Sequence, residues 1–154
     1  MVHSNQHEPN RFTPVVKAME LVDHVLTITD NINKFPDYTT KEKKNEDGTV
    51  TLVMVQRQDG LVNWAREQAM QIYLLAFTAN EINLTKEPWR KEERLQKQEA
   101  AISLCGEHLA LTQLCQKHFH LSHKKVKYWG NLTIGVRDSL KWWNNSDKDR
   151  YKNI

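Results

Sequence analysis

The chain has few residues that cross-link a backbone or interrupt a helix: two cysteines, five glycines and four prolines among 154 residues. Cys105 and Cys115 fall within one predicted helix, about 15 Å apart along its axis, which is too far for a disulfide. We therefore predict reduced, partly buried thiols. The glycines and prolines lie mostly outside the periodic stretches, which indicates a helical protein.

Several signatures of membrane insertion and catalysis are also missing. No apolar run approaches the roughly 18 residues that a membrane span needs, and the N-terminal MVHSNQHEPN lacks the apolar core of a signal peptide. The chain contains no GxGxxG, GxxxxGK[ST], GxSxG or CxxC. Glu107 and His108 are adjacent, unlike the ExxH pair of a di-iron bundle. We expect a cytoplasmic, non-enzymatic protein without a cofactor or membrane contact.

The most strongly patterned stretch runs from Ser122 to Asn145, SHKKVKYWGNLTIGVRDSLKWWNN. Side chains suited to a core recur there every three or four residues, which places them on one face of a helix. Ser122 offers a hydroxyl that can cap the first backbone N–H groups. The predicted core-facing residues are Val126, Trp129, Thr133, Val136, Leu140 and Trp143.

A second face of this helix is small in the middle and aromatic at both ends. It comprises Tyr128, Leu132, Gly135, Ser139 and Trp142. Two interpretations remain open: contact with a neighbouring helix of the same chain, or contact between subunits. The middle of the predicted second helix is apolar nearly all the way round, which suits a covered surface. The sequence therefore predicts an oligomer with an interface formed by Met70, Tyr73, Phe77, Tyr128, Leu132 and Trp142.

Three further helices precede this one. Thr13 and Pro14 are typical of an N-cap followed by the first helical residue, and that helix is expected to reach about Phe35. The other two are expected over 61–83 and 89–118. The charged first half of the third, WRKEERLQKQEA, is interpreted as a solvated surface. In its second half, His108 is predicted to be a hydrogen-bonded core residue.

Short second and third connections favour antiparallel neighbours. The predicted fold class is all-α, an antiparallel up-down-up-down four-helix bundle. It forms a single domain over 12–145, after a disordered 1–11 and before a polar tail at 146–154.

The segment 37–60 changes period and interrupts the helical pattern. Asp47-Gly48 is a turn signal, followed by the β-branched run from Thr49 to Val55. A β-hairpin inserted between the first two helices is predicted, with a mobile loop as the alternative. Because an isolated hairpin is marginally stable in water, it should pack on the bundle or pair with another subunit.

Charge is concentrated locally, although the net charge is only +3. Between Lys117 and Lys127 the chain reads KHFHLSHKKVK, which contains no acid and adjoins the predicted N-terminus of the last helix. Cationic side chains and free backbone N–H groups together favour phosphate. The predicted nucleic-acid-binding residues are Lys117, His120, His123, Lys124, Lys125, Lys127, Arg137 and Lys141.

Three histidines in this stretch, His118, His120 and His123, form an HxHxxH cluster. Neutral imidazoles at this spacing could bind a divalent metal. The surrounding lysines and the lack of a nearby cysteine or aspartate favour a basic solvated corner instead.

Several segments together resemble a known family. They are Lys34-Phe35-Pro36 at the end of the first helix, LVNWAREQAM at the start of the second and LSHKKVKYWGNLTIGVRDSLKWW in the last. This pattern, from about Val15 to Trp143, is similar to the four-helix-bundle family of the accessory variability protein (Avd) of diversity-generating retroelements. The ribosomal-RNA intervening-sequence proteins share that fold group. The insertion is longer than is usual in the family, and the Ser-Ile-Pro-x-Asn-Ile-Ala-Glu-Gly type segment of the intervening-sequence branch is missing.

The resemblance implies a homopentameric barrel of bundles that binds RNA or DNA without strong sequence preference, together with a reverse transcriptase. The leading hypothesis is thus a non-enzymatic, oligomeric accessory protein of a retroelement. One alternative is a helical interaction module of a mobile element that does not bind nucleic acid. The other is a hydrolase that uses a metal at His118, His120 or His123.

Overall fold

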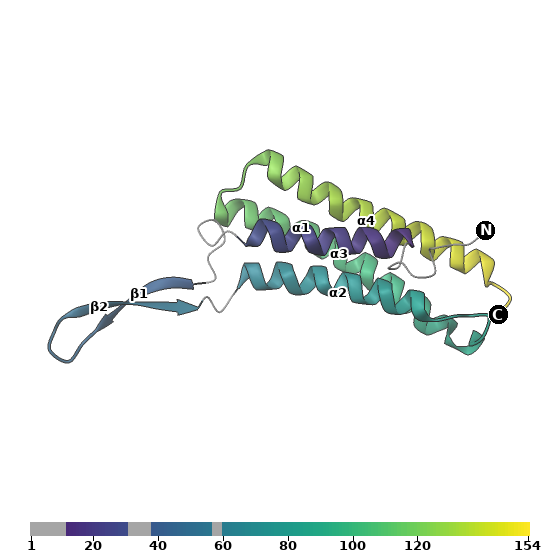
Figure 1. Cartoon of the computed structure of the whole chain (residues 1–154), viewed down its shortest axis with the longest axis horizontal. Helices are drawn as coiled ribbons and strands as arrows, with labels where there is room; N and C mark the ends of the chain where they lie inside the picture. Colours follow the sequence, from purple (N-terminus) through teal and green to yellow (C-terminus); the bar gives the residue numbers. More distant parts are fainter. Residues whose placement is uncertain (1–11, 31–37, 57–59) are drawn as a thin grey trace, which may run out of the picture.

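The computed structural model describes residues 12–30, 38–56 and 60–154. It shows an all-α, antiparallel four-helix bundle with a two-stranded β-hairpin between the first two helices (Figure 1), as predicted. The predicted disordered segment 1–11 lies outside the described residues. The elements are α1 (Thr13–Thr29), β1 (Tyr38–Lys44), β2 (Val50–Gln56), α2 (Leu61–Glu81), the 3-10 helix η2 (Pro88–Arg90), α3 (Lys91–Phe119) and α4 (His123–Arg150).

The helices form a closed ring around one core. Each helix packs on the next in sequence, and α1 packs on α4 (Figure 1). The buried stripe of α2 is rich in alanine, which allows its neighbours to approach closely, whereas α4 contributes the large Trp129. Within the described ranges, no helix combines the length and the hydropathy of a membrane span.

Most of the predicted inner face of α4 is buried: Trp129, Thr133, Val136, Leu140 and Trp143 are at most 3% exposed. Val126 is half-buried. Ser122 caps the helix, since its Oγ accepts the Lys125 N–H at 3.2 Å. The helix extends beyond residue 146, where a polar tail was expected to begin: α4 continues to Arg150, and Asp147 is buried.

The helix boundaries at the other connections also differ from expectation. Phe12 rather than Thr13 occupies the N-cap of α1, and the helix ends at Thr29 rather than near Phe35. Residues 31–37 are outside the described ranges. Arg66 of α2 bonds to Thr29 at both its hydroxyl (2.9 Å) and its carbonyl (3.0 Å), which satisfies the end of α1. Helix α2 ends at Glu81, because the Asn83 side chain accepts the Thr85 N–H at 2.9 Å and forms a turn.

The β-hairpin is antiparallel, with Lys44 opposite Val50. Gly48 has a φ of 85° and donates its N–H to the Asn45 carbonyl oxygen at 3.0 Å. This is a three-residue turn that ends on a left-handed glycine, so the Asp47-Gly48 turn signal is confirmed. The described hairpin residues make no extended packing contact with the helices, and Figure 1 shows the hairpin projecting beyond one end of the bundle.

Candidate nucleic-acid interface

The turn between α3 and α4 is held in one shape by its own backbone and by two apolar anchors. His120 adopts the left-handed conformation (φ 53°), and the Leu121 N–H bonds to the Gln116 carbonyl oxygen at 3.3 Å. This 6→1 bond is the Schellman ending of a helix. Phe119 and Leu121 are buried on the core at 7% and 5% exposure. The turn is therefore held against the core by Phe119 and Leu121, while its basic side chains face solvent.

The structure brings most of the predicted nucleic-acid-binding residues together at this end of the bundle. We call the exposed residues Lys117, His120, His123, Lys124, Lys125 and Lys127 the basic turn. Within the described part of the chain, no carboxylate lies within ion-pair distance of its four lysines. No aspartate or glutamate occurs between Glu107 and Asp138. The positive charge of the turn is thus accessible and has no carboxylate partner among the residues that the structure describes.

Position along the helices separates these basic residues into two groups. Lys117 lies in the last turn of α3, where the helix dipole favours a positive charge. His123, Lys124 and Lys125 begin α4, whose first turn contains no acid. A cation there faces the positive end of the dipole and is disfavoured by about 0.3–1 kcal/mol. The first turn of α3 has the stabilising pattern instead, with Glu92 and Glu93.

Acidic residues of α1 limit the basic surface on one side. Glu20 and Asp23 line a groove of about 320 Å³ between α1 and α4, together with His24, Tyr128 and Leu132. Nε2 of His24 is buried without a hydrogen-bond partner, and burial lowers the pKa of this imidazole. The accessible basic surface therefore extends over the solvent side of α4 rather than into this groove.

The two predicted binding residues farther along α4 differ from one another. Lys141 is exposed. The Arg137 side chain is 29% exposed, and its Nε lies 3.8 Å from the Asp138 carboxylate. Burial raises the pKa of Cys105 to about 12, although the charge of Arg137 acts in the opposite direction. Arg137 is thus close to the α3 side of the core and is the least accessible member of the predicted set.

The three histidines of the HxHxxH cluster, His118, His120 and His123, are all exposed. Among the residues that the structure describes, no group of three histidine, cysteine or carboxylate side chains is arranged to hold a metal ion. Cys105 and Cys115 are free and buried, and burial raises the pKa of Cys115 to about 11. Thiols of this kind have little thiolate at neutral pH.

His108 is a hydrogen-bonded core residue, as predicted. Its ring is fully buried, with Nε2 3.0 Å from Nε1 of Trp129 and Nδ1 2.9 Å from Oε1 of Gln68. The indole N–H can only donate, so Nε2 accepts and Nδ1 carries the proton. Burial lowers the pKa of His108 to about 4. Because both ring nitrogens have partners in the neutral form, this histidine is structural.

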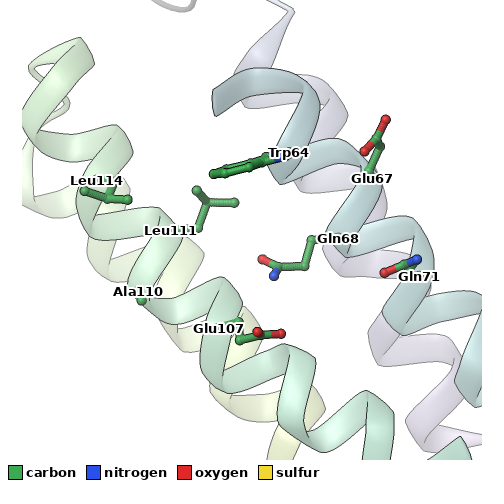
Figure 2. A pocket seen from close by; sticks show the side chains of 8 residues that line it. All are labelled: Trp64, Glu67, Gln68, Gln71, Glu107, Ala110, Leu111 and Leu114. Carbon is green, nitrogen blue, oxygen red and sulfur yellow. The ribbon is translucent and has the colours of Figure 1, made fainter. Parts of the chain in front are cut away.

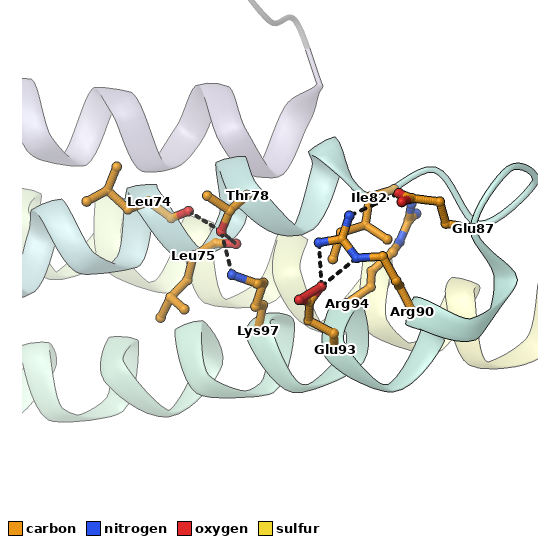
Figure 3. A network of polar contacts seen from close by, with 9 residues as sticks. All are labelled: Leu74, Leu75, Thr78, Ile82, Glu87, Arg90, Glu93, Arg94 and Lys97. Atoms are coloured by element: carbon orange, nitrogen blue, oxygen red, sulfur yellow. Dashed lines mark hydrogen bonds and ion pairs between the residues drawn. The ribbon is translucent and has the colours of Figure 1, made fainter.

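At the opposite end of the bundle lies a buried polar cluster that the sequence analysis missed. Arg94 Nε and Nη2 donate to the two carboxylate oxygens of Asp147 at 2.7 and 3.0 Å, and Nη1 donates to the Ile82 carbonyl oxygen. Gln98 donates to Asp147 and accepts from Asn144. Figure 3 shows Arg94 beside the half-buried Arg90, which pairs with Glu87 and Glu93. We call Arg94, Gln98, Asn144 and Asp147 the buried polar cluster.

The predicted interface residues occupy two different faces on either side of α1. Three of them lie on the side of α2 that faces α1, the side from which Arg66 reaches Thr29. Met70 is 44% exposed there, and Tyr73 and Phe77 are half-buried with ring centroids 5.9 Å apart. On α4, Tyr128 stacks edge-on against His24 of α1 at 4.9 Å. Leu132 lines the same groove, whereas Trp142 is 63% exposed. The second face of α4 thus contacts a helix of its own chain and remains partly open.

A third apolar surface was not predicted. A groove of about 440 Å³ lies between α2 and α3. Figure 2 shows Trp64, Leu111 and Leu114 lining it, together with Glu67 and Glu107. Trp64 is 59% exposed and Leu114 is 45% exposed. The sequence signal was present, since Trp64 is a large aromatic residue near the start of a helix whose core positions are alanines.

No protein family, curated protein or solved structure matches the chain in comparisons of sequence and structure.

Proposed function

We propose that this protein is a non-enzymatic, oligomeric nucleic-acid-binding protein, and that the basic turn contacts the phosphate backbone. The observation that carries the proposal is the positive charge at the N-terminus of α4, which no carboxylate in the described ranges pairs. Lys124 and Lys125 are exposed there. They lie beside the first backbone N–H groups of α4, which have no hydrogen-bond acceptor within the helix itself.

The energetics of this arrangement favour an external anion. Cations at a helix N-terminus reduce the stability of the helix, and no described carboxylate offsets them. A phosphate bound at this position interacts favourably with the lysines and with the dipole together. The same residues that are unfavourable in the free protein therefore become favourable in a complex.

Several features support a polyanion rather than a small phosphate ligand. The residues of the basic turn are exposed, and none of them lines the grooves described above between α2 and α3 or between α1 and α4. Lys141 is a further exposed cation about four helical turns along α4 from Lys127, although the exposed Asp138 lies between them in the sequence. Contacts of this type are made to the backbone, so binding should show little sequence preference and strong salt dependence.

The proposal also includes a homo-oligomeric state and a protein partner. The exposed Met70, Tyr128 and Trp142 support assembly through bundle faces. The resemblance to the Avd family suggests a homopentamer that acts beside the reverse transcriptase of a retroelement. In such a ring the basic turn is repeated in every subunit, so weak contacts add through effective concentration. Sedimentation that shows only an 18.1 kDa monomer at micromolar concentration would contradict assembly.

Lysine footprinting tests the binding surface directly. The protein is acetylated briefly with and without mixed-sequence single-stranded RNA or duplex DNA, and the modified lysines are read by mass spectrometry. Lys117, Lys124, Lys125 and Lys127 should be protected, whereas Lys86 and Lys152 at the other end should react equally in both samples. Protection that is absent from the basic turn would exclude it as the binding surface. Failure to bind either probe would favour the interaction module without nucleic-acid binding.

A further inference from the structure

The β-hairpin has two open edges and little packing of its own. Val50 and Leu52 on β2 are 55% and 68% exposed, and the described hairpin residues have no extended contact with the helices. An isolated two-stranded hairpin is marginally stable in water, and an unpaired edge is a template for another strand. We propose that β2 pairs with β2 of a second copy of this chain, which gives a four-stranded antiparallel sheet in the order β1-β2-β2-β1.

The backbone geometry identifies the groups that are available for such pairing. Asn45 donates its N–H to the Thr49 carbonyl oxygen at 2.8 Å, so Thr49 faces β1. Backbone groups alternate in direction along an antiparallel strand. Val50 and Leu52 therefore point their N–H and C=O groups away from β1, while Thr51 and Val53 continue the ladder within the hairpin.

Charge distinguishes the two edges. β1 reads YTTKEKK, and its exposed Lys41, Lys43 and Lys44 would face the lysines of another β1 edge. Edge lysines of this kind commonly prevent strand addition. β2 reads VTLVMVQ and contains no charged residue, so two copies of it can meet without repulsion. The β2 edge is therefore compatible with itself, and the β1 edge is not.

The charges of the hairpin also argue against nucleic acid as its binding partner. Its lysines are balanced by an equal number of acids, and two of these acids lie at the tip. The charged residues of 38–56 are Lys41, Glu42, Lys43, Lys44, Glu46 and Asp47. A segment without net charge gains little from a polyanion.

A second copy also satisfies the geometry of a symmetric contact. In a two-fold dimer the same patch meets itself, and two identical strands related in this way are antiparallel. Alternation along the strand then places Val50 and Leu52 of both copies on one face of the joined sheet. One strand pair is smaller than a standard interface, so we expect reversible association that weakens on dilution.

Proline scanning at two matched positions tests the proposal. Leu52 and Glu42 are opposite one another in the hairpin, and both have outward N–H groups. Leu52→Pro removes a donor from the β2 edge, and Glu42→Pro removes the equivalent donor from the β1 edge, without deleting a bond of the internal ladder. Sedimentation velocity over a dilution series should show that Leu52→Pro loses an association step and that Glu42→Pro retains it. Equal behaviour of the two variants would overturn the proposal.

Amide exchange of the unmodified protein gives a second readout that does not depend on a substitution. At high concentration the Leu52 N–H should exchange at least about tenfold more slowly than the Glu42 N–H, and dilution should remove the difference. Equal exchange rates at high concentration would contradict β2 pairing even if the bundles assemble through their helical faces. Conversely, loss of lysine protection in the footprint would leave this inference untouched, because the basic turn lies outside the hairpin.

Discussion

The two ends of the bundle use charged residues in opposite ways. At one end, Arg94 and Asp147 are buried, joined by two hydrogen bonds and surrounded by further partners. At the other end, Lys124 and Lys125 are exposed and lack a described carboxylate within ion-pair distance, at a helix terminus that disfavours them. Both regions read as charged segments in the sequence. Burial and pairing, rather than residue type, determine which of them stabilises the fold and which is available for a ligand.

The largest expected effect comes from breaking the buried polar cluster. Asp147→Ala leaves Arg94 buried without its carboxylate, which should lower the free energy of unfolding by about 3–5 kcal/mol. Urea unfolding followed by circular dichroism measures this change. The matched control is Glu99→Ala, because Glu99 and Lys148 also join α3 to α4, at 3.0 Å, but are about half exposed. That variant should change stability by at most about 1 kcal/mol; similar losses in both variants would contradict the comparison.

The next effect concerns pH and the buried His108. Its folded-state pKa is about 4, compared with 6.5 for the free side chain. Between these values the unfolded chain binds a proton that the folded protein does not, so stability is lost as pH falls below 6.5. The expected slope is about 1.4 kcal/mol per pH unit, before other groups are counted.

A variant isolates this contribution to the pH dependence. Glutamine at position 108 can still accept from Trp129 but cannot titrate, so His108→Gln should have a shallower dependence between pH 4 and 6.5. Urea unfolding at several pH values measures both slopes. Parallel slopes for the two proteins would show that His108 is not responsible. Burial of His24 lowers the pKa of that group too, so some dependence should remain in the variant.

A smaller effect is expected at the cap of α4. Ser122→Ala removes the acceptor of the Lys125 N–H and should cost about 1 kcal/mol in thermal or urea unfolding. Ser122→Asp should at least preserve stability, because it keeps an acceptor and adds a negative charge beside the basic first turn. Greater destabilisation by aspartate than by alanine would contradict the electrostatic account of this end.

The smallest expected effect is that of the basic turn on folding. Replacing Lys124, Lys125 and Lys127 together by glutamine should change the free energy of unfolding by less than about 0.5 kcal/mol, or raise it slightly. These lysines are exposed and unpaired among the described residues, and two of them, Lys124 and Lys125, lie at the positive end of the α4 dipole. A loss above about 2 kcal/mol would mean that they have a structural role.

The sequence predicted features that depend on local pattern. Spacing in α4 identified Trp129, Val136 and Leu140 as core residues, and Asp47-Gly48 identified the turn of the hairpin. Arg94 and Asp147 are 53 positions apart, so no local pattern pairs them. A signal existed nevertheless: Asp147 follows Trp143 by four positions and continues the core stripe of α4. Polar residues on an apolar stripe are candidates for buried pairs, whereas we interpreted these as surface and tail.

Part of the candidate site was predictable and part was not. The absence of acids between Glu107 and Asp138 is visible in the sequence, as is the cap at Ser122. The partial burial of Arg137 could not be predicted, because it depends on the orientation of α4 about its own axis relative to α3. The predicted interface was similarly divided: Met70 and Trp142 share apolar character, but packing places them on different faces.

The most direct test of the central claim is a nucleic-acid binding titration that compares the two ends of the bundle. In one variant, glutamine replaces Lys124, Lys125 and Lys127. In the control, which has the same change in charge, glutamine replaces three exposed lysines at the other end of the bundle, Lys86, Lys148 and Lys152. Filter binding of wild type and both variants is measured at two salt concentrations, with the oligomeric state checked by sedimentation. The account predicts that the basic-turn variant loses affinity and salt dependence, while the control resembles wild type. Equal affinity of all three proteins would contradict it.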